Sequence, residues 1–307
     1  MAIVLISSKK DNGAWVEAIK QQAPDLPIEV YPHVSDREKI TGALLWAHPA
    51  GVLDEFPHLQ WVSSLGAGAN HILTDPHLPE NVLITRVVDE NLATDMGRTA
   101  LMAVLTYENN LRDYFNDQIE KKWRPQFKKQ NLTIGILGLG EMGRAIALDL
   151  QKLNFRIWGY SLTKKSLKGV KTFHGPEPPK EFLQGIDVLV SVLPLTSGTR
   201  GILNKNLFGA LKRGTYLINL GRGEHLHEAD LVPAIEKGQL SGAYLDVFCA
   251  EPLPEDHPFW IHRKITITPH VASLTNPASA STVIVDNYRR LMAGQPLKYV
   301  VDKGRGY

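Results

Sequence analysis

The chain of 307 residues has little of what several classes of protein require. Its single cysteine, Cys249, excludes a disulfide within the chain, which suits the reducing cytoplasm. Its 34 Lys and Arg nearly balance 32 Asp and Glu without any block of like charge, which argues against a nucleic-acid or membrane-surface partner. No apolar run approaches the roughly 18 residues of a membrane helix, and the apolar start lacks a signal peptide's basic region. We therefore expect a cytoplasmic protein that binds neither nucleic acid nor membrane.

What the sequence does contain is a regular alternation of short apolar runs with helical patterns, which predicts parallel sheets covered by helices. The runs lie at 2–6, 28–31, 43–46, 60–65 and 82–87, and again at 132–137, 156–160, 187–193, 215–220, 242–247 and 265–268. Several are apolar throughout, as in strands buried on both faces. Between the two series, apolar residues from Ala100 to Phe115 recur at helical spacing and predict one long amphipathic helix. The simplest interpretation is two α/β units joined by this helix, with a last helix at about 278–293.

The segment TIGILGLGEMG at 133–143 carries the pattern G-x-G-x-x-G at Gly138, Gly140 and Gly143. An apolar run precedes it and a helical pattern follows, which is the context in which this pattern binds a dinucleotide. The first glycine would allow a tight turn, the second an approach to the pyrophosphate, and the third close packing of helix on strand. We expect a dinucleotide site here that includes Glu141 and Met142 at the helix start. An ordinary glycine-rich turn is the alternative.

The stretch WGYSLTKKS at 158–166 bears on which dinucleotide binds. A free ribose 2′-OH is usually held by an acidic residue about here, and this stretch has none. Ser161 and Thr163 can donate hydrogen bonds and Lys164 and Lys165 supply positive charge, which favours a 2′-phosphate. The sequence therefore predicts NADP(H) rather than NAD(H). The alternative is that both lysines are solvated loop residues and that NAD(H) is used as well.

Three further segments carry groups suited to hydride chemistry. INLGRGEH contains Arg222, YLDVFCAEPLP contains Glu251, and ITITPHVA contains His270. Arg222 and His270 come just after predicted strands, at the sheet edge where open α/β folds bind their ligands. An arginine, a glutamate and a histidine beside a nicotinamide indicate reduction of a carboxylated substrate.

Taken in order, the motifs resemble those of the D-isomer-specific 2-hydroxyacid dehydrogenases over essentially the whole chain, and among these the reductases of glyoxylate and hydroxypyruvate. The motifs are LGAGA at 65–69, GILGLGEMG, SVLPLTSGT at 191–199, INLGRG, LDVFCAEPLP, ITPHVA and the ending RGY. The resemblance implies a Rossmann-type coenzyme domain, residues 96–279, inserted into a flavodoxin-like substrate domain, residues 1–95 and 280–307. It also implies a homodimer that acts on a small 2-oxo acid.

The resemblance also implies roles for individual residues. Arg222 would bind the carboxylate and C2 oxygen of the substrate, protonated His270 would donate the proton, and Glu251 would hold the imidazole. Further residues are implied along the cofactor and the substrate: Leu193, Pro194, Thr196 and Asp246 for the cofactor, and Trp46, Gly66, Ala67, Gly68 and Trp260 for the substrate.

The N–H groups of the loop 66–68 could form an anion nest, although a plain glycine turn is the alternative. Asp246 could equally be structural, and the two tryptophans could belong to the core. No metal is expected. A bulkier 2-oxo acid as substrate, or a non-catalytic nucleotide-sensing protein on the same fold, remain as other interpretations.

Overall fold

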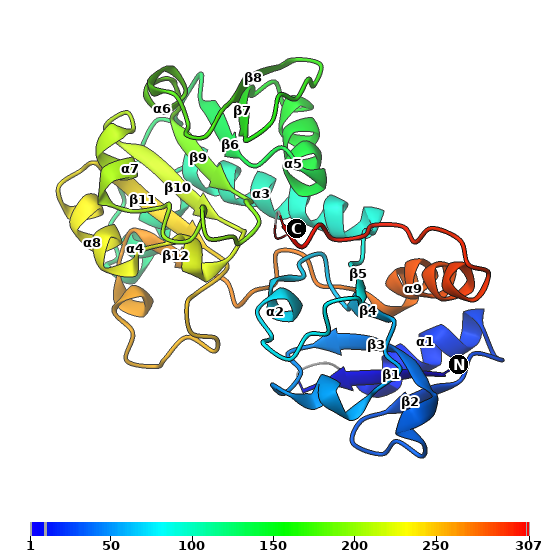
Figure 1. Ribbon diagram of the computed structural model, residues 1–307. Coiled ribbons are helices and arrows are strands. Elements are labelled where there is room, and N and C mark those ends of the chain that lie inside the picture. Colours follow the sequence, from blue (N-terminus) through cyan, green and yellow to red (C-terminus); the bar gives the residue numbers. More distant parts are fainter. Residues whose placement is uncertain (1, 9–10, 305, 307) are drawn as a thin grey trace. The chain divides into compact units, whose positions relative to one another are not determined.

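The computed structural model describes residues 2–8, 11–304 and 306. Arg305 and Tyr307, which belong to the RGY ending, therefore lie outside the described residues. The chain forms two compact units, residues 1–92 with 275–307, and residues 93–274 (Figure 1). None of the described helices is long and apolar enough to cross a membrane.

The first unit is a five-stranded parallel sheet with strand order β2-β1-β3-β4-β5, the flavodoxin-like order. Its strands are β1 (Ala2–Ser7), β2 (Ile28–Val30), β3 (Ile40–Trp46), β4 (Trp61–Ser64) and β5 (Leu83–Thr85). Its helices are α1 (Asn12–Gln22), α2 (Asn70–Leu73) and α9 (Pro277–Met292), with the 3-10 turns η1 (Arg37–Lys39) and η2 (Val52–Glu55). The last helix, α9, packs beside α1 (Figure 1), and Gln22 Nε2 of α1 donates to Ser281 Oγ of α9 over 2.6 Å. The tail then follows β5, because Val301 N–H donates to the carbonyl of Ile84.

The second unit is a seven-stranded parallel sheet with strand order β12-β11-β10-β9-β6-β7-β8. Its strands are β6 (Thr133–Leu137), β7 (Arg156–Ser161), β8 (Val170–His174), β9 (Val188–Ser191), β10 (Thr215–Asn219), β11 (Leu240–Leu245) and β12 (Ile265–Ile267). Its helices are α4 (Leu111–Ile119), α5 (Glu141–Gln151), α6 (Lys180–Gly185), α7 (Lys205–Ala210) and α8 (Glu228–Glu236), with the 3-10 turns η3 (Gly223–His225) and η4 (Pro258–Ile261). The order reverses between β6 and β9, as in a Rossmann fold, so the predicted fold class is confirmed.

The central strands of the second unit are buried on both faces, as their uninterrupted apolar sequences predict. Side chains alternate between two cores along each strand, so Leu189 and Leu217 lie in one core while Val190 and Ile218 lie in the other. All of these side chains are 0% exposed. Because every pairing in the sheet is parallel, the carboxyl ends of all seven strands lie along one edge.

The prediction of one long helix from Ala100 to Phe115 is wrong. In this stretch the structure has two helices, α3 (Glu90–Glu108) and α4. The division between the two units falls within α3, after Leu92. The break occurs at Asn110, which has a left-handed conformation with φ 55°. Asparagine tolerates this conformation, and the Asn110 side-chain amide donates to the carbonyl of Phe127, 2.9 Å away. A contact distant in sequence therefore ends a helix that local periodicity would continue.

Strand β8 has no counterpart among the predicted strands. Its sequence, VKTFH, contains only two apolar residues, Val170 and Phe173, and no residue of the strand is fully buried. It lies at the edge of the sheet, where it pairs only with β7 among the described strands. A search for wholly apolar runs misses such an edge strand because only part of it packs on a core.

Candidate active site

The glycine loop joins β6 to α5 at the point where the strand order reverses. Gly138 has φ +102°, a conformation that side chains rarely adopt, and forms the tight turn. A Cβ on Gly143 would overlap the carbonyl oxygen of Gly138, so only glycine lets α5 pack this close to β6. Around Gly140 the space is open, since no atom lies within 4 Å of the place that a Cβ would occupy. The loop and the free N–H groups of the 11-residue helix α5 therefore fit a dinucleotide pyrophosphate.

The residues proposed to select the cofactor lie at the end of β7, next to β6 in the sheet. Ser161 is buried, and its hydroxyl donates to the carbonyl of Thr163 over 2.8 Å. Thr163, Lys164 and Lys165 are exposed, and neither lysine pairs with a carboxylate among the described residues. The loop thus presents two free ammonium groups and no acidic side chain.

The loop after β9 contains the predicted cofactor residues Leu193, Pro194 and Thr196, all partly buried. It is closed by Thr199, whose hydroxyl donates to the carbonyl of Pro194 over 2.6 Å and accepts from the N–H of Thr196 over 2.8 Å. Because β9 lies between β6 and β10, this loop lies between the glycine loop and the segment that carries Arg222.

Arg222 follows β10 and begins the turn η3. Its guanidinium donates to the carbonyl of Gly221 over 2.8 Å, and its own carbonyl accepts from the side chain of Asn219 over 3.0 Å. A Cβ on Gly223 would overlap the backbone of Phe248, so the segment that carries Arg222 lies directly against the segment that leads to Glu251.

Glu251 and His270 form a hydrogen-bonded pair. His270 Nδ1 and Glu251 Oε2 are 2.7 Å apart, and Glu251 Oε1 accepts from the N–H of Phe248 over 3.0 Å. Burial acts to raise the pKa of the Glu251 carboxyl, but the bonds from His270 and Phe248 and the charge of Arg222 outweigh it and lower that pKa. With Nδ1 engaged, the other ring nitrogen, Nε2, is left to act on a substrate.

Burial is likewise the largest influence on Arg222, and it lowers the pKa of the guanidinium, while Glu224 and Glu251 act to raise it. The guanidinium stays charged, because an arginine side chain is not deprotonated in proteins. The site thus offers one fixed positive charge beside a carboxylate–imidazole pair.

Asp246, predicted to contact the nicotinamide amide, is 0% exposed and is used to shape the segment that carries His270. Its carboxylate accepts from the Thr268 hydroxyl over 2.6 Å and from the N–H groups of Val271 and Ala272 over 3.0 and 2.9 Å. Its carbonyl accepts from the N–H of His270 over 2.8 Å. These bonds stabilise His270 in a left-handed conformation, φ 54°, which is uncommon for a residue with a side chain. A contact of Asp246 with the cofactor stays a prediction.

The predicted substrate loop belongs to the first unit, between β4 and α2. Gly66 donates its N–H to the Ser64 hydroxyl over 3.2 Å, whereas the N–H groups of Ala67 and Gly68 have no partner among the described residues. The Trp46 ring lies 2.6 Å from the Cβ position of Gly66, so a larger residue would not fit there. The predicted anion nest is thereby reduced to two N–H groups.

Several of the site features were not predicted from the sequence. Arg86 donates to the carbonyl of Ala67 over 3.4 Å, and His225 contacts both Arg222 and Pro194. His225 is part of the segment INLGRGEH, but nothing in the sequence indicated its burial. Trp260, in contrast, is 47% exposed and its indole N–H donates to the carbonyl of Pro254 over 2.8 Å, so its part in a substrate pocket stays a prediction. Among the described residues, no group of three or more His, Cys, Asp or Glu side chains could hold a metal ion.

Comparison with known proteins places this arrangement in a family. Residues 101–272 match the model of the D-isomer specific 2-hydroxyacid dehydrogenase NAD binding domain. The chain belongs to the D-isomer specific 2-hydroxyacid dehydrogenases. It is 40% identical over 300 residues to a glyoxylate/hydroxypyruvate reductase A from Serratia proteamaculans, covering 95% of this chain and 96% of that one.

Solved structures of other members of the dehydrogenase family have the same fold. A 2-hydroxyacid dehydrogenase from Xanthobacter autotrophicus, in complex with NADPH and MES, has a TM-score of 0.95 and 36% identity, over 100% of this chain and 99% of that one. An NADPH-dependent glyoxylate/hydroxypyruvate reductase from Sinorhizobium meliloti, in complex with NADP and sulfate, has a TM-score of 0.93 and 33% identity over 100% of both chains.

Proposed function

We propose that this protein reduces small 2-oxo acids, such as glyoxylate and hydroxypyruvate, to 2-hydroxy acids with NADPH. The observation that carries the proposal is the 2.7 Å pairing of Glu251 with His270, at the same sheet edge as Arg222 and the glycine loop. The relative from Serratia proteamaculans is named for both substrates, and the structures from Xanthobacter and Sinorhizobium contain NADPH or NADP.

Each residue of the site has a definite part in this reaction. Bound NADPH would supply the hydride that C2 of the substrate receives. Arg222 binds the substrate carboxylate and the C2 oxygen, and its charge stabilises the negative charge that develops on that oxygen. His270, held at Nδ1 by Glu251, donates the proton from Nε2 to the same oxygen. The product is the 2-hydroxy acid, and the imidazole then regains its proton from solvent.

The preference for NADPH rests on Lys164 and Lys165. A 2′-phosphate carries negative charge, and these two exposed ammonium groups have no carboxylate partner among the described residues. Replacing both with glutamate should lower kcat/KM with NADPH and change it little with NADH, because NADH lacks the phosphate. Lys180→Glu, another exposed lysine of the same unit, is the matched control. If the ratio of kcat/KM with NADPH to kcat/KM with NADH is unchanged in the double variant, the lysines do not contact the phosphate.

The direct test of the proposed reaction is an initial-rate assay with glyoxylate and hydroxypyruvate, using NADPH and NADH side by side. Turnover with a clear NADPH preference supports the proposal. Equal rates with both cofactors contradict the cofactor part of it. If neither acid is reduced, bulkier 2-oxo acids are tried next, and cofactor binding without turnover on any of them would indicate a nucleotide-sensing protein.

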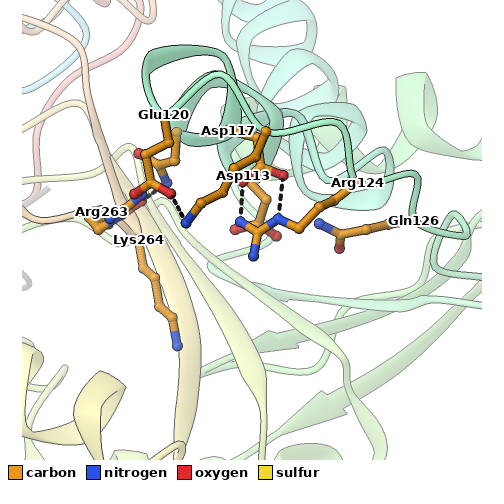
Figure 2. Close-up of a pocket in the computed structure, with 9 residues that line it drawn as sticks. Asp113, Asp117, Glu120, Arg124, Gln126, Arg263 and Lys264 are labelled. Atoms are coloured by element: carbon orange, nitrogen blue, oxygen red, sulfur yellow. Dashed lines mark hydrogen bonds and ion pairs between the residues drawn. The ribbon is translucent and has the colours of Figure 1, made fainter.

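We also propose that the protein forms a homodimer through the segment from Ile119 to Phe127. Ile119, Trp123 and Phe127 are 82%, 96% and 100% exposed, and exposed apolar side chains, aromatic ones above all, are typical of protein interfaces. The segment is not loose, since ion pairs fix it to the rest of its unit. They join Arg124 to Asp117 and Glu120 to Arg263, beside a surface cleft of about 660 Å³ (Figure 2).

Light scattering after size-exclusion chromatography tests the dimer. Trp123→Glu should shift the mass toward that of the monomer, because a buried charge would oppose association. Leu153→Asp, which changes a 48% exposed apolar side chain shortly after α5, should leave the mass unchanged. A wild-type protein that elutes as a monomer at micromolar concentration contradicts this proposal.

A cytoplasmic location, expected from the single cysteine, also stays a proposal. Fractionation of the cells that produce the protein, followed by immunodetection, would test it. Recovery of the protein in a membrane or exported fraction would contradict it.

A further inference from the structure

One buried histidine outside the Glu251–His270 pair connects two parts of the site. His225 is 0% exposed. Its Nδ1 accepts from the N–H of Arg222 over 3.2 Å, and its Nε2 lies 3.2 Å from the carbonyl oxygen of Pro194. The ring therefore joins the segment after β10 to the loop after β9. The two segments are neighbours because β9 and β10 pair in the sheet.

The two bonds fix the protonation state of the His225 ring. Since Nδ1 accepts from a backbone N–H, it carries no proton, and Nε2 must carry the proton that is donated to the Pro194 carbonyl. Burial, with the charges of Arg222 and Arg200, lowers the pKa of His225 to about 4, although the bond to Pro194 acts to raise it. The ring is therefore neutral near pH 7, as both bonds require.

The backbone of His225 is fixed as well. Its carbonyl accepts from the N–H of Leu203 over 2.8 Å, and the carbonyl of Leu203 accepts from the N–H of His227 over 3.0 Å. These backbone bonds hold the ring in place. Nδ1 accepts from the backbone of Arg222, the arginine proposed to bind the substrate, and Nε2 donates to Pro194 in the loop predicted to lie along the cofactor.

We infer that His225 is a positioning residue that aligns the Arg222 backbone with the cofactor loop at Pro194 by hydrogen-bonding both with one neutral ring. The inference rests on the proposed function, because it assigns the Arg222 side to the 2-oxo acid and the Pro194 side to NADPH. It predicts that loss of the Nδ1 contact affects binding of the 2-oxo acid, whereas loss of the Nε2 contact affects binding of NADPH.

Two substitutions separate the contacts. In His225→Asn, the side-chain oxygen can occupy the place of Nδ1 and accept from Arg222, but nothing reaches Pro194. In His225→Gln, the longer amide can place an N–H near Nε2 and donate to Pro194, but it removes the bond that His225 Nδ1 accepts from the N–H of Arg222. Asparagine should therefore raise KM for NADPH, and glutamine should raise KM for the 2-oxo acid. Each increase should be roughly five- to 100-fold, the effect of one buried group left without its hydrogen bond.

Thr199→Val is the matched control. It removes the other hydrogen bond to the Pro194 carbonyl without touching Arg222, so it should raise KM for NADPH and leave KM for the 2-oxo acid within about twofold, as expected for a change that spares that contact. KM does not depend on how much of a variant folds, so a low yield does not obscure the result. Thermal melting accompanies each measurement.

The outcomes distinguish this inference from the proposed function. A crossed pattern, with a different KM raised in each His225 variant, supports it. If both KM values rise together in both variants, or neither changes, His225 has only a structural role and the inference is wrong while the proposed function stands. A wild-type protein that reduces no 2-oxo acid overturns both.

Discussion

Replacing Glu251 with glutamine is the most informative single perturbation of the site, because it removes a charge and retains the shape. The glutamine oxygen can still accept from the N–H of Phe248, so the backbone of the segment is preserved. What is lost is the charge-assisted bond to His270 Nδ1, 2.7 Å long. That bond holds the imidazole by Nδ1, so that Nε2 is left to act as the proton donor of the proposed mechanism.

The expected decrease in kcat depends on how exposed the Glu251–His270 pair is. A hydrogen bond that involves a charged group contributes about 1.5–3 kcal/mol when buried. The two side chains are 37% and 32% exposed, so solvent screening places the pair at the lower end of that range. A loss of about 1.5–2 kcal/mol corresponds to a decrease in kcat of roughly 10- to 30-fold.

The assay is steady-state reduction of glyoxylate with saturating NADPH. We expect kcat of Glu251→Gln to fall by that factor, because the imidazole loses the charge-assisted bond that orients it. Glu255→Gln removes an equal charge from an exposed position in the same loop and should leave kcat unchanged. If kcat is unchanged in the Glu251 variant, the pair has no part in proton transfer and the reasoning is refuted.

Four further predictions test other parts of the site. His270→Ala should lower kcat by roughly 10²–10⁴, the range for loss of a general acid, and near-normal turnover in a rapid-mixing assay would contradict its role. Arg222→Lys should raise KM for the 2-oxo acid because an ammonium cannot form the bidentate contact; an unchanged kcat/KM would argue against it. Gly223→Ala should lower the melting temperature and the activity, because the new Cβ would overlap the backbone of Phe248; calorimetry of a variant as stable as wild type would disprove that contact. Folded His225 has a pKa of about 4, below the unfolded value of about 6.5, so stability should be lost as pH falls through this window, by about 2 kcal/mol between pH 7 and pH 5. Urea unfolding at both pH values should show this loss in wild type and less of it in His225→Asn.

Much of the fold could be predicted because the signals are local. The apolar runs of the central strands, such as 187–193 and 215–220, reflect burial on both faces, and the strands lie within those ranges. Glycine at 138 and 143 was predicted to shape the turn and the packing of α5, and the structure has both features. The parallel order of the strands also places Arg222 and His270 at one edge, as expected for loops that follow them.

The errors arise where distant contacts override local pattern. The spacing from Ala100 to Phe115 is helical throughout, but the bond from Asn110 to the carbonyl of Phe127 ends the helix early. For Asp246 the resemblance implies a cofactor contact, which stays a prediction, and the structure adds a structural role. Its three hydrogen bonds to residues 268–272 could not be read from the sequence.

The sequence by itself determined the α/β class and the glycine loop and indicated the side chains proposed to react, because periodicity, backbone freedom and functional-group chemistry belong to residues and their near neighbours. Only the tertiary structure decided which groups meet: Glu251 with His270 across 19 positions, and His225 between Arg222 and Pro194. The physical reason is that pairing and protonation depend on distance and burial, which arise when β9 to β12 align in one sheet.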